Sequence, residues 1–372
     1  MVAKVYEEMK DKEVGIKDTD INANIGDRDA KNDVNADALL KLKDLKVSFF
    51  TPAGEVKAVG GISYDLKYGE VMGIVGESGS GKSVEAYSII GLLQSPGKVM
   101  GGEILFEGEN VLEYSAEKMQ SFRGNKVSMI FQNPMTSLNP VYTIGNQLME
   151  ALLCHDKIDK KIAWEKSVEM LNLVGINNPE QRMNQYPHEL SGGMRQRVMI
   201  AMGLICNPKL LIADEPTTAL DVTIQAQIIE LMKEIQGKTG MAIIFITHNL
   251  GVVAEICDRV TVMYAGKIVE QGTVDDIFYR ASHPYTLGLM RSMPRVDAES
   301  YERLIPIEGS PVDMLNPPEG CGFGARCEHC MKVCLRKEPP LVDLGNGHFS
   351  KCWLMALSEK SGETGSNQEK EA

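Results

Sequence analysis

The sequence predicts an α/β fold with a largely parallel sheet, and three observations lead to that prediction. First, "EVMGIVG" (70–76) has the apolar content of a buried strand, and a glycine-rich turn and a helix through "SVEAYSIIGLL" (83–93) follow it. Second, "KLLIADE" (209–215) and "MAIIFITH" (241–248) are continuously apolar, which is typical of parallel strands covered on both faces. Third, the segment between them, 222–236, has the spacing of an amphipathic helix.

The sequence also predicts an antiparallel strand pair, a helical subdomain and a C-terminal extension. Alternating apolar residues in "LLKLKDLKVSFF" (39–50) and "VKAVGGISYDL" (56–66) predict two antiparallel strands joined by a turn at 52–54. From about 137 to 195 the apolar spacing is helical, which predicts a helical subdomain, and from 284 the chain becomes Pro- and Cys-rich. We therefore predict an acidic tail, a main domain, an extension and a second tail, at 1–38, 39–283, 284–356 and 357–372.

Length and composition limit the possible classes of protein. A chain of 372 residues with 43% hydrophobic side chains can fill one large domain and something smaller. Its net charge of -12 argues against a general nucleic-acid surface, because such surfaces need clustered Lys and Arg. No apolar run approaches the roughly 18 residues that span a bilayer, and the first residues lack the apolar stretch of a secretory signal. We expect a cytosolic protein that reaches a membrane only through a partner.

The stretch "GESGSGKS" (76–83) fits the phosphate-loop pattern G-x-x-x-x-G-K-[ST], and it lies between a predicted strand and a predicted helix. The backbone N–H groups of such a turn and the helix N-terminus attract phosphates. Lys82 is expected to reach the β- and γ-phosphates of ATP, and Ser83 is expected to bind Mg²⁺. The predicted nucleotide-binding residues of this loop are Gly76, Ser78, Gly79, Ser80, Gly81, Lys82 and Ser83.

Two adjacent carboxylates at the end of a predicted strand supply the complementary chemistry. Asp214 in "LLIADEP" is placed to bind the Mg²⁺ shell, and Glu215 is placed to polarise a water for in-line attack on the γ-phosphate. Apolar runs that end in Asp-Glu also occur by chance. The motif gains its weight from its position, about 130 residues after a phosphate loop.

The segment "LSGGMRQRV" (190–198) resembles the signature motif of ABC-type ATPases. That resemblance implies a RecA-like parallel sheet core, an antiparallel β subdomain and a helical signature subdomain. In the family this motif closes over the ATP of a second subunit. Ser191, Gly192 and Gly193 are therefore expected to act in trans in a head-to-tail dimer.

The other positions of the family pattern follow in order along the chain. Gln132 in "FQNPMTSLNP" matches the loop glutamine that senses Mg²⁺ and the γ-phosphate, and Asp221 in "TALD" matches the D-loop. His248 in "ITHNL" matches the switch histidine, which completes the expected catalytic set with Gln132 and the strand-end glutamate. Phe49 stands where the family places an aromatic ring under the adenine, although Phe50 could do the stacking.

Longer segments narrow the resemblance within the ABC proteins. "VGESGSGKS", "MIFQNPMTSLNPVYTIGNQL" and "HPYTLGLMRSMPR" resemble the ATPase subunits of oligopeptide, dipeptide and nickel importers, and Met194 after the signature glycines favours the D-type member of their D/F pair. The resemblance implies a heterodimer with an F-type ATPase, two membrane permeases and an extracytoplasmic solute-binding protein. It also implies a peripheral place on the cytoplasmic face of the membrane.

The C-terminal extension concentrates cysteines, for which three readings are open. In the family a C-terminal extension with the spacing Cys-x5-Cys-x6-Cys and a distant fourth cysteine occurs, and some members hold a [4Fe–4S] cluster there. Cys330 forms a CxxC with Cys327 that would equally suit zinc, and His348 is a further candidate ligand. Reduced thiols without a metal are the third reading, because cytosolic residence disfavours disulfides. The candidate cluster ligands are Cys321, Cys327, Cys334 and Cys352.

Two other classes of function compete with transport. A soluble ABC protein that acts on nucleic acid or ribosomes usually has tandem ATPase modules or a long coiled-coil insertion, and this chain has neither. A non-enzymatic module with a degenerate ATPase is opposed by the intact set of Lys82, Asp214, Glu215 and His248.

Overall fold

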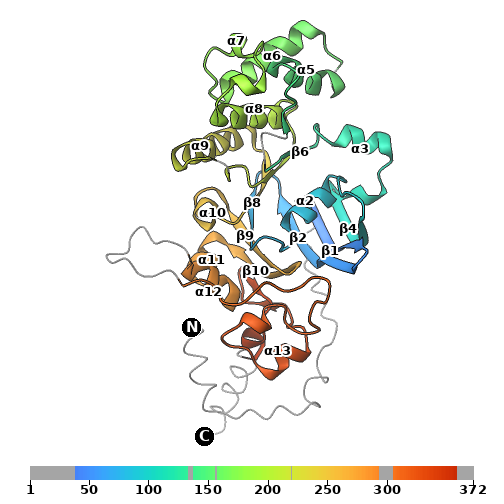
Figure 1. The fold of residues 1–372 in the computed structure, drawn as a ribbon, viewed down its shortest axis with the longest axis vertical. Coiled ribbons are helices and arrows are strands. Elements are labelled where there is room, and N and C mark those ends of the chain that lie inside the picture. Colours follow the sequence, from blue (N-terminus) through green and yellow to red (C-terminus); the bar gives the residue numbers. More distant parts are fainter. Residues whose placement is uncertain (1–37, 133–136, 156, 219, 293–304, 358–372) are drawn as a thin grey trace, which may run out of the picture.

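The computed structural model has an elongated shape with three regions, and it describes residues 38–132, 137–155, 157–218, 220–292 and 305–357. The main sheet lies in the middle, a helical region forms one end and the C-terminal region forms the other (Figure 1). The predicted tails, 1–38 and 357–372, lie outside the described residues apart from Ala38 and Leu357.

The main sheet has eight strands in the order β11-β12-β10-β9-β3-β8-β7-β6. Neighbouring strands from β9 to β6 run parallel, and the three strands at the other edge are antiparallel. The two continuously apolar runs form the adjacent strands β7 and β8, whose residues are all buried, so the prediction of covered parallel strands is confirmed. The bounds are β3 Val71–Val75, β6 Val127–Ile130, β7 Leu210–Asp214, β8 Ala242–Thr247, β9 Arg259–Tyr264, β10 Lys267–Thr273, β11 Val342–Asp343 and β12 Phe349–Ser350.

A second, antiparallel sheet of four strands has the order β2-β1-β4-β5 and packs beside helix α2 (Figure 1). The predicted hairpin at one edge of this sheet is confirmed, because β1 pairs with β2 from Ala38↔Lys67 to Thr51↔Gly54. The β1 residues Leu39, Leu40, Leu42, Leu45 and Val47 are buried in one apolar cluster with strands of the main sheet, and this shared core holds the two sheets together. The bounds are β1 Ala38–Thr51, β2 Gly54–Lys67, β4 Gly97–Phe106 and β5 Glu109–Asn110.

Helices α5, α6 and α7 form the end of the molecule opposite the C-terminal region (Figure 1). The apolar faces of α5, α6 and α8 share one core cluster with residues of β7 and β8, which ties this helical region to the sheet. Trp164 packs against this cluster. The helices are α2 Lys82–Ile89, α3 Ala116–Phe122, α5 Ile144–His155, α6 Lys160–Leu173, α7 Pro179–Arg182, α8 Gly192–Leu204, α9 Val222–Thr239, α10 Leu250–Ile256, α11 Val274–Tyr279, α12 Pro284–Arg291 and α13 Lys332–Arg336.

The C-terminal region returns to the main sheet. β12 pairs with β10 through Glu270↔Ser350, and β11 pairs with β12, so the cysteine-rich segment is closed by strands that continue the sheet. Glu270 is fully buried and accepts hydrogen bonds from the backbone N–H groups of Ser282 (2.6 Å) and His283 (3.1 Å). Its carboxylate thereby holds the start of α12 against β10.

Among the residues that the structure describes, every helix is too short or too polar to span a lipid bilayer.

Candidate nucleotide site and cysteine pocket

The phosphate loop connects the end of β3 to the start of α2, and two of its glycines have no room for a side chain. Gly76 has a φ of 156°, and a Cβ there would lie 2.2 Å from the carbonyl oxygen of Met263. Gly81 has a φ of 100°, and its Cβ would lie 2.6 Å from the carbonyl oxygen of Ala58. The turn therefore depends on glycine at both positions.

The ammonium group of Lys82 lies inside this loop. Nζ donates to the carbonyl oxygens of Gly76 (2.7 Å) and Glu77 (2.9 Å) and to Oγ of Ser80 (3.3 Å). Burial lowers the pKa of Lys82, while the carboxylates of Glu215 and Asp214 act in the opposite direction. A cation enclosed by a glycine-rich turn is suited to bind phosphate oxygens.

The two predicted Mg²⁺ ligands of the loop and the strand end meet. Oγ of Ser83, in the first turn of α2, donates to Oδ1 of Asp214 at the end of β7, at 3.1 Å. Burial raises the pKa of Asp214, and the bond from Ser83 opposes that rise. An oxygen pair of a hydroxyl and a carboxylate fits the ligand preference of Mg²⁺.

Glu215 receives hydrogen bonds from three side chains. Gln132 Nε2 donates to Oε2 at 2.8 Å, Thr218 Oγ1 donates to the same oxygen at 2.8 Å, and His248 Nδ1 lies 3.1 Å from Oε1. Burial acts to raise the pKa of Glu215, but the bonds from His248 and Thr218 outweigh it and the pKa is lowered. A carboxylate that stays ionised is suited to orient a water. Thr218 is not part of the sequence prediction, and no pattern in the sequence points to it.

The residues of the signature motif lie at the start of α8, apart from the phosphate loop at the start of α2. Ser191 caps α8 by accepting from the N–H of Met194 at 3.4 Å, and helix α8 lies in the helical end of the molecule (Figure 1). A Cβ on Gly192 would meet open space, whereas one on Gly193 would lie 3.1 Å from a methyl group of Ile224. Asp221 caps α9 by accepting from the N–H of Ile224 at 3.0 Å. The fold therefore leaves the start of α8 open toward solvent.

The two candidate aromatic residues differ in exposure. Phe49 is half-buried and packs against the core of the antiparallel sheet. Phe50 is 43% exposed, and Nζ of Lys98 lies 5.7 Å from the centre of its ring. Stacking of an adenine on Phe49 stays a prediction.

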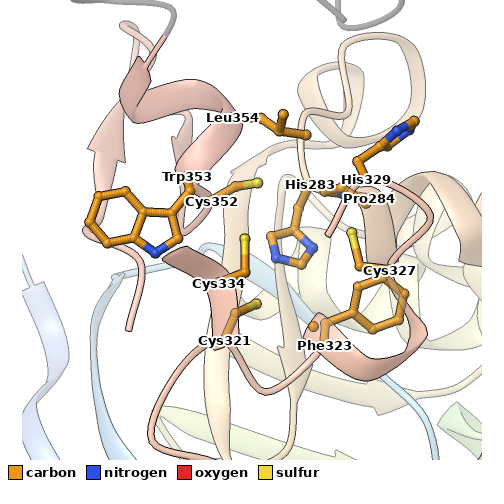
Figure 2. A pocket seen from close by; sticks show the side chains of 11 residues that line it. His283, Pro284, Cys321, Phe323, Cys327, His329, Cys334, Cys352, Trp353 and Leu354 are labelled. Atoms are coloured by element: carbon orange, nitrogen blue, oxygen red, sulfur yellow. The ribbon is translucent and has the colours of Figure 1, made fainter. Parts of the chain in front are cut away.

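The four candidate cluster cysteines line one pocket, and Figure 2 shows their sulfurs turned toward the space around the His283 ring. These four cysteines come from three places in the C-terminal region, since Cys321 and Cys327 flank a short loop, Cys334 lies in α13 and Cys352 follows β12. Burial raises the pKa of the Cys327 and Cys352 thiols to about 12. All eight cysteines are free thiols.

Two further candidate ligands, His348 and Cys330, lie outside the pocket. His348 is not among the pocket residues, because its Nε2 lies 2.9 Å from Oε1 of the buried Glu270. Cys330 is exposed and does not line the pocket. Within the described part of the chain, no group of three or more His, Cys, Asp or Glu side chains is arranged to hold a metal ion.

A phosphate loop at the end of β3, a carboxylate pair at the end of β7 and a helical subdomain with a signature helix together define the class of ABC-type ATPases. A model of the ABC transporter family matches residues 59–218. The solved dimer of the ATP-binding cassette MJ0796 with ADP and phosphate has a TM-score of 0.57 at 26% identity, and the match covers 63% of this chain and 98% of that one. A cassette from Clostridium perfringens matches with the same score at 30% identity, over 65% of this chain and 91% of its own. The predicted ABC fold and ATPase activity are confirmed.

Closer relatives place the chain within that class. The oligopeptide transport ATP-binding protein OppD of Bacillus subtilis is 56% identical over 318 residues, which cover 85% of this chain and 89% of OppD. OppD of Escherichia coli is 51% identical over 318 residues, with 86% and 94% covered. A model of the oligopeptide/dipeptide transporter C-terminal region matches residues 269–334. The chain belongs to the family of oligopeptide and dipeptide transport ATP-binding proteins.

Proposed function

We propose that this ATPase powers the import of peptides through two membrane permeases. In this proposal it is the D-type subunit of a heterodimer with an F-type ATPase and lies on the cytoplasmic face of the membrane, with an extracytoplasmic binding protein delivering the solute. The names of the relatives support the peptide substrate, and the match to the oligopeptide/dipeptide C-terminal region supports the transporter type. A nickel importer of the same family is the second candidate.

The observation that carries the catalytic proposal is the convergence of three side chains on Glu215. Glu215 takes a proton from the water that attacks the γ-phosphate, while Gln132 and His248 keep its carboxylate oriented. Lys82 binds the β- and γ-phosphates. Ser83 and Asp214, with Gln132 nearby, would hold Mg²⁺, which neutralises phosphate charge when bound.

The second half of each nucleotide site comes from the partner ATPase. Ser191, Gly192 and Gly193 lie at the start of α8, where backbone N–H groups and the helix dipole attract anions. Because they lie in the helical end of the molecule, away from Lys82, we infer that they bind the nucleotide of the partner subunit (Figure 1). Asp221 lies at the start of α9 and belongs to the same dimer interface.

The cysteine pocket is the proposed site of a [4Fe–4S] cluster. Such a cluster needs four thiolates, and the pocket contains four of the five cysteines of the extension. When bound it would supply four iron–thiolate bonds that join the segments carrying Cys321, Cys327, Cys334 and Cys352. Cys330 stays outside the ligand set because it does not line the pocket. Zinc is the alternative metal.

Purification of the tagged chain from its native membranes in mild detergent tests the transport proposal. Two permeases and a second ATPase are expected to purify with it, and short peptides, not Ni²⁺, should stimulate ATP hydrolysis after reconstitution with the binding protein. Stimulation by Ni²⁺ alone would favour the nickel importer. Recovery of ribosomes or nucleic acid in place of permeases would contradict a transport function.

A further inference from the structure

A bidentate ion pair joins the cysteine-rich region to the phosphate loop. The guanidinium of Arg326 donates to both carboxylate oxygens of Glu77, with Nη1 to Oε2 at 2.6 Å and Nη2 to Oε1 at 3.0 Å. The Arg326 side chain is only 5% exposed and that of Glu77 is 27% exposed. Bidentate ion pairs between a guanidinium and a carboxylate are among the stronger polar contacts in proteins.

Glu77 is also held through its backbone, next to the group that binds phosphate. Its N–H donates to the hydroxyl of Tyr285 at 2.8 Å, and its carbonyl oxygen accepts from Nζ of Lys82 at 2.9 Å. One residue of the phosphate loop therefore contacts Arg326, α12 and the phosphate-binding lysine. A shift of the Glu77 backbone would alter the position of Lys82.

Arg326 itself is fixed by contacts to the C-terminal region and to the end of β9. Its Nε donates to the carbonyl oxygen of Glu308 at 2.9 Å, its Nη2 donates to that of Ile307 at 3.2 Å, and its Nη1 lies 3.3 Å from the hydroxyl of Tyr264. The next residue, Cys327, lines the cysteine pocket. The guanidinium thus transmits the position of the 321–327 loop to the phosphate loop.

We propose that Arg326 is a positioning residue for nucleotide binding. It neutralises the Glu77 carboxylate, which would otherwise repel the triphosphate, and it fixes the loop that presents Lys82. Because coupling between two sites is reciprocal, the conformation of the cysteine-rich loop and the affinity for ATP depend on each other. The inference requires ATP binding but neither a peptide substrate nor a cluster.

The affinity of the full-length protein for Mg-ATP tests this coupling. Arg326→Ala should raise the Kd by roughly tenfold, a usual size for coupled sites. Arg326→Lys should raise it less, because a lysine keeps the charge but not the bidentate geometry. The matched control is Arg291→Ala, which removes an exposed ion pair with Glu328 (3.4 Å) from the same region and should leave the Kd unchanged.

Two readouts separate positioning from a purely structural role. Glu77→Gln in the Arg326→Ala background should restore much of the affinity, because it removes the unpaired carboxylate; loss of a structural anchor would not be relieved in this way. The rise in Tm that ATP produces should also shrink in Arg326→Ala, beyond any drop in Tm without ATP. Hydrogen exchange of the 321–334 segment should slow when ATP binds to the wild-type protein but not to Arg326→Ala.

Wild-type affinity in folded Arg326→Ala would overturn the inference, as would a double variant that binds no better than Arg326→Ala. If Arg326→Ala does not fold, Arg326→Lys decides the question, and an unchanged Kd and unchanged ATP-induced shift in Tm for that variant would overturn it.

Discussion

Nδ1 of His248 lies 3.1 Å from Oε1 of Glu215, although the two residues follow different strands. Glu215 follows β7 and His248 follows β8, and these strands are parallel neighbours. Gln132 follows β6, the strand on the other side of β7, and reaches the same carboxylate at 2.8 Å. The carboxyl ends of three adjacent parallel strands therefore meet at one glutamate.

Glu215→Gln should stop multiple turnover while ATP binding persists, because the amide cannot accept the proton of the attacking water. We expect kcat to fall by roughly 10²- to 10⁴-fold, the usual contribution of a general base. Steady-state hydrolysis and ATP affinity, measured on the same preparation, check this. Glu230→Gln on the exposed face of α9 is the control. Rapid multiple turnover by Glu215→Gln would show that another group activates the water.

Glu85 gives a prediction about the pH dependence of stability. It is buried in α2 beside Tyr64, and burial raises its pKa to about 8, although the bond from the Tyr64 hydroxyl opposes the rise. In the unfolded chain the pKa of this glutamate is about 4.5. Between that pH and about 8 its carboxyl group is therefore protonated in the folded state but ionised in the unfolded state. The free energy of unfolding should therefore fall as the pH rises through this interval.

Glu85→Gln should remove this slope, since its amide does not titrate. Denaturant unfolding at pH 5 and pH 8 should show that the variant gains most over the wild type at pH 8. Glu103→Gln, which changes an exposed carboxylate, should keep the wild-type slope. An equal slope in wild type and Glu85→Gln would place the source of the pH dependence elsewhere.

The cysteine proposal predicts different results for two cysteines. After anaerobic purification we expect about four irons and four sulfides per chain, as a [4Fe–4S] cluster requires. Cys321→Ser should lose them, and Cys330→Ser, the matched control from the same segment, should keep them. Iron, acid-labile sulfide and zinc analysis with an absorbance spectrum checks this. Stoichiometric zinc that depends on Cys330 would refute the proposed ligand set.

The buried Glu270 gives a prediction about the attachment of the C-terminal region. Glu270→Ala leaves the N–H groups of Ser282 and His283 and the ring of His348 without their acceptor. We expect the free energy of unfolding to fall by about 3 kcal/mol, as for other buried hydrogen-bonded charges. Glu328→Ala, at an exposed ion pair, should stay within about 0.5 kcal/mol of wild type. A similarly small effect of Glu270→Ala would argue against the carboxylate as the anchor.

Much of the fold could be predicted because its signals are local. The buried run at 209–215 forms β7, the alternating runs at 39–50 and 56–66 form the β1–β2 hairpin, and "GESGSGKS" forms the turn between β3 and α2. Each depends on apolar periodicity or on glycine conformation, which nearby residues specify. The pairing of β12 with β10 lacks such a signal, since β12 has only two residues and lies far from β10 in the sequence.

The ABC class, the nucleotide loop and the carboxylate pair can be predicted from the motifs alone, because those motifs carry their chemistry in contiguous residues. Which side chains meet across the chain depends on the packing of the folded molecule. In the folded chain Glu215 contacts Gln132 and His248. His348 contacts Glu270, and Arg326 contacts Glu77, which lies 249 residues earlier in the chain. The residues next to these side chains in the sequence do not predict such contacts, because the contacts depend on how distant strands and loops pack together.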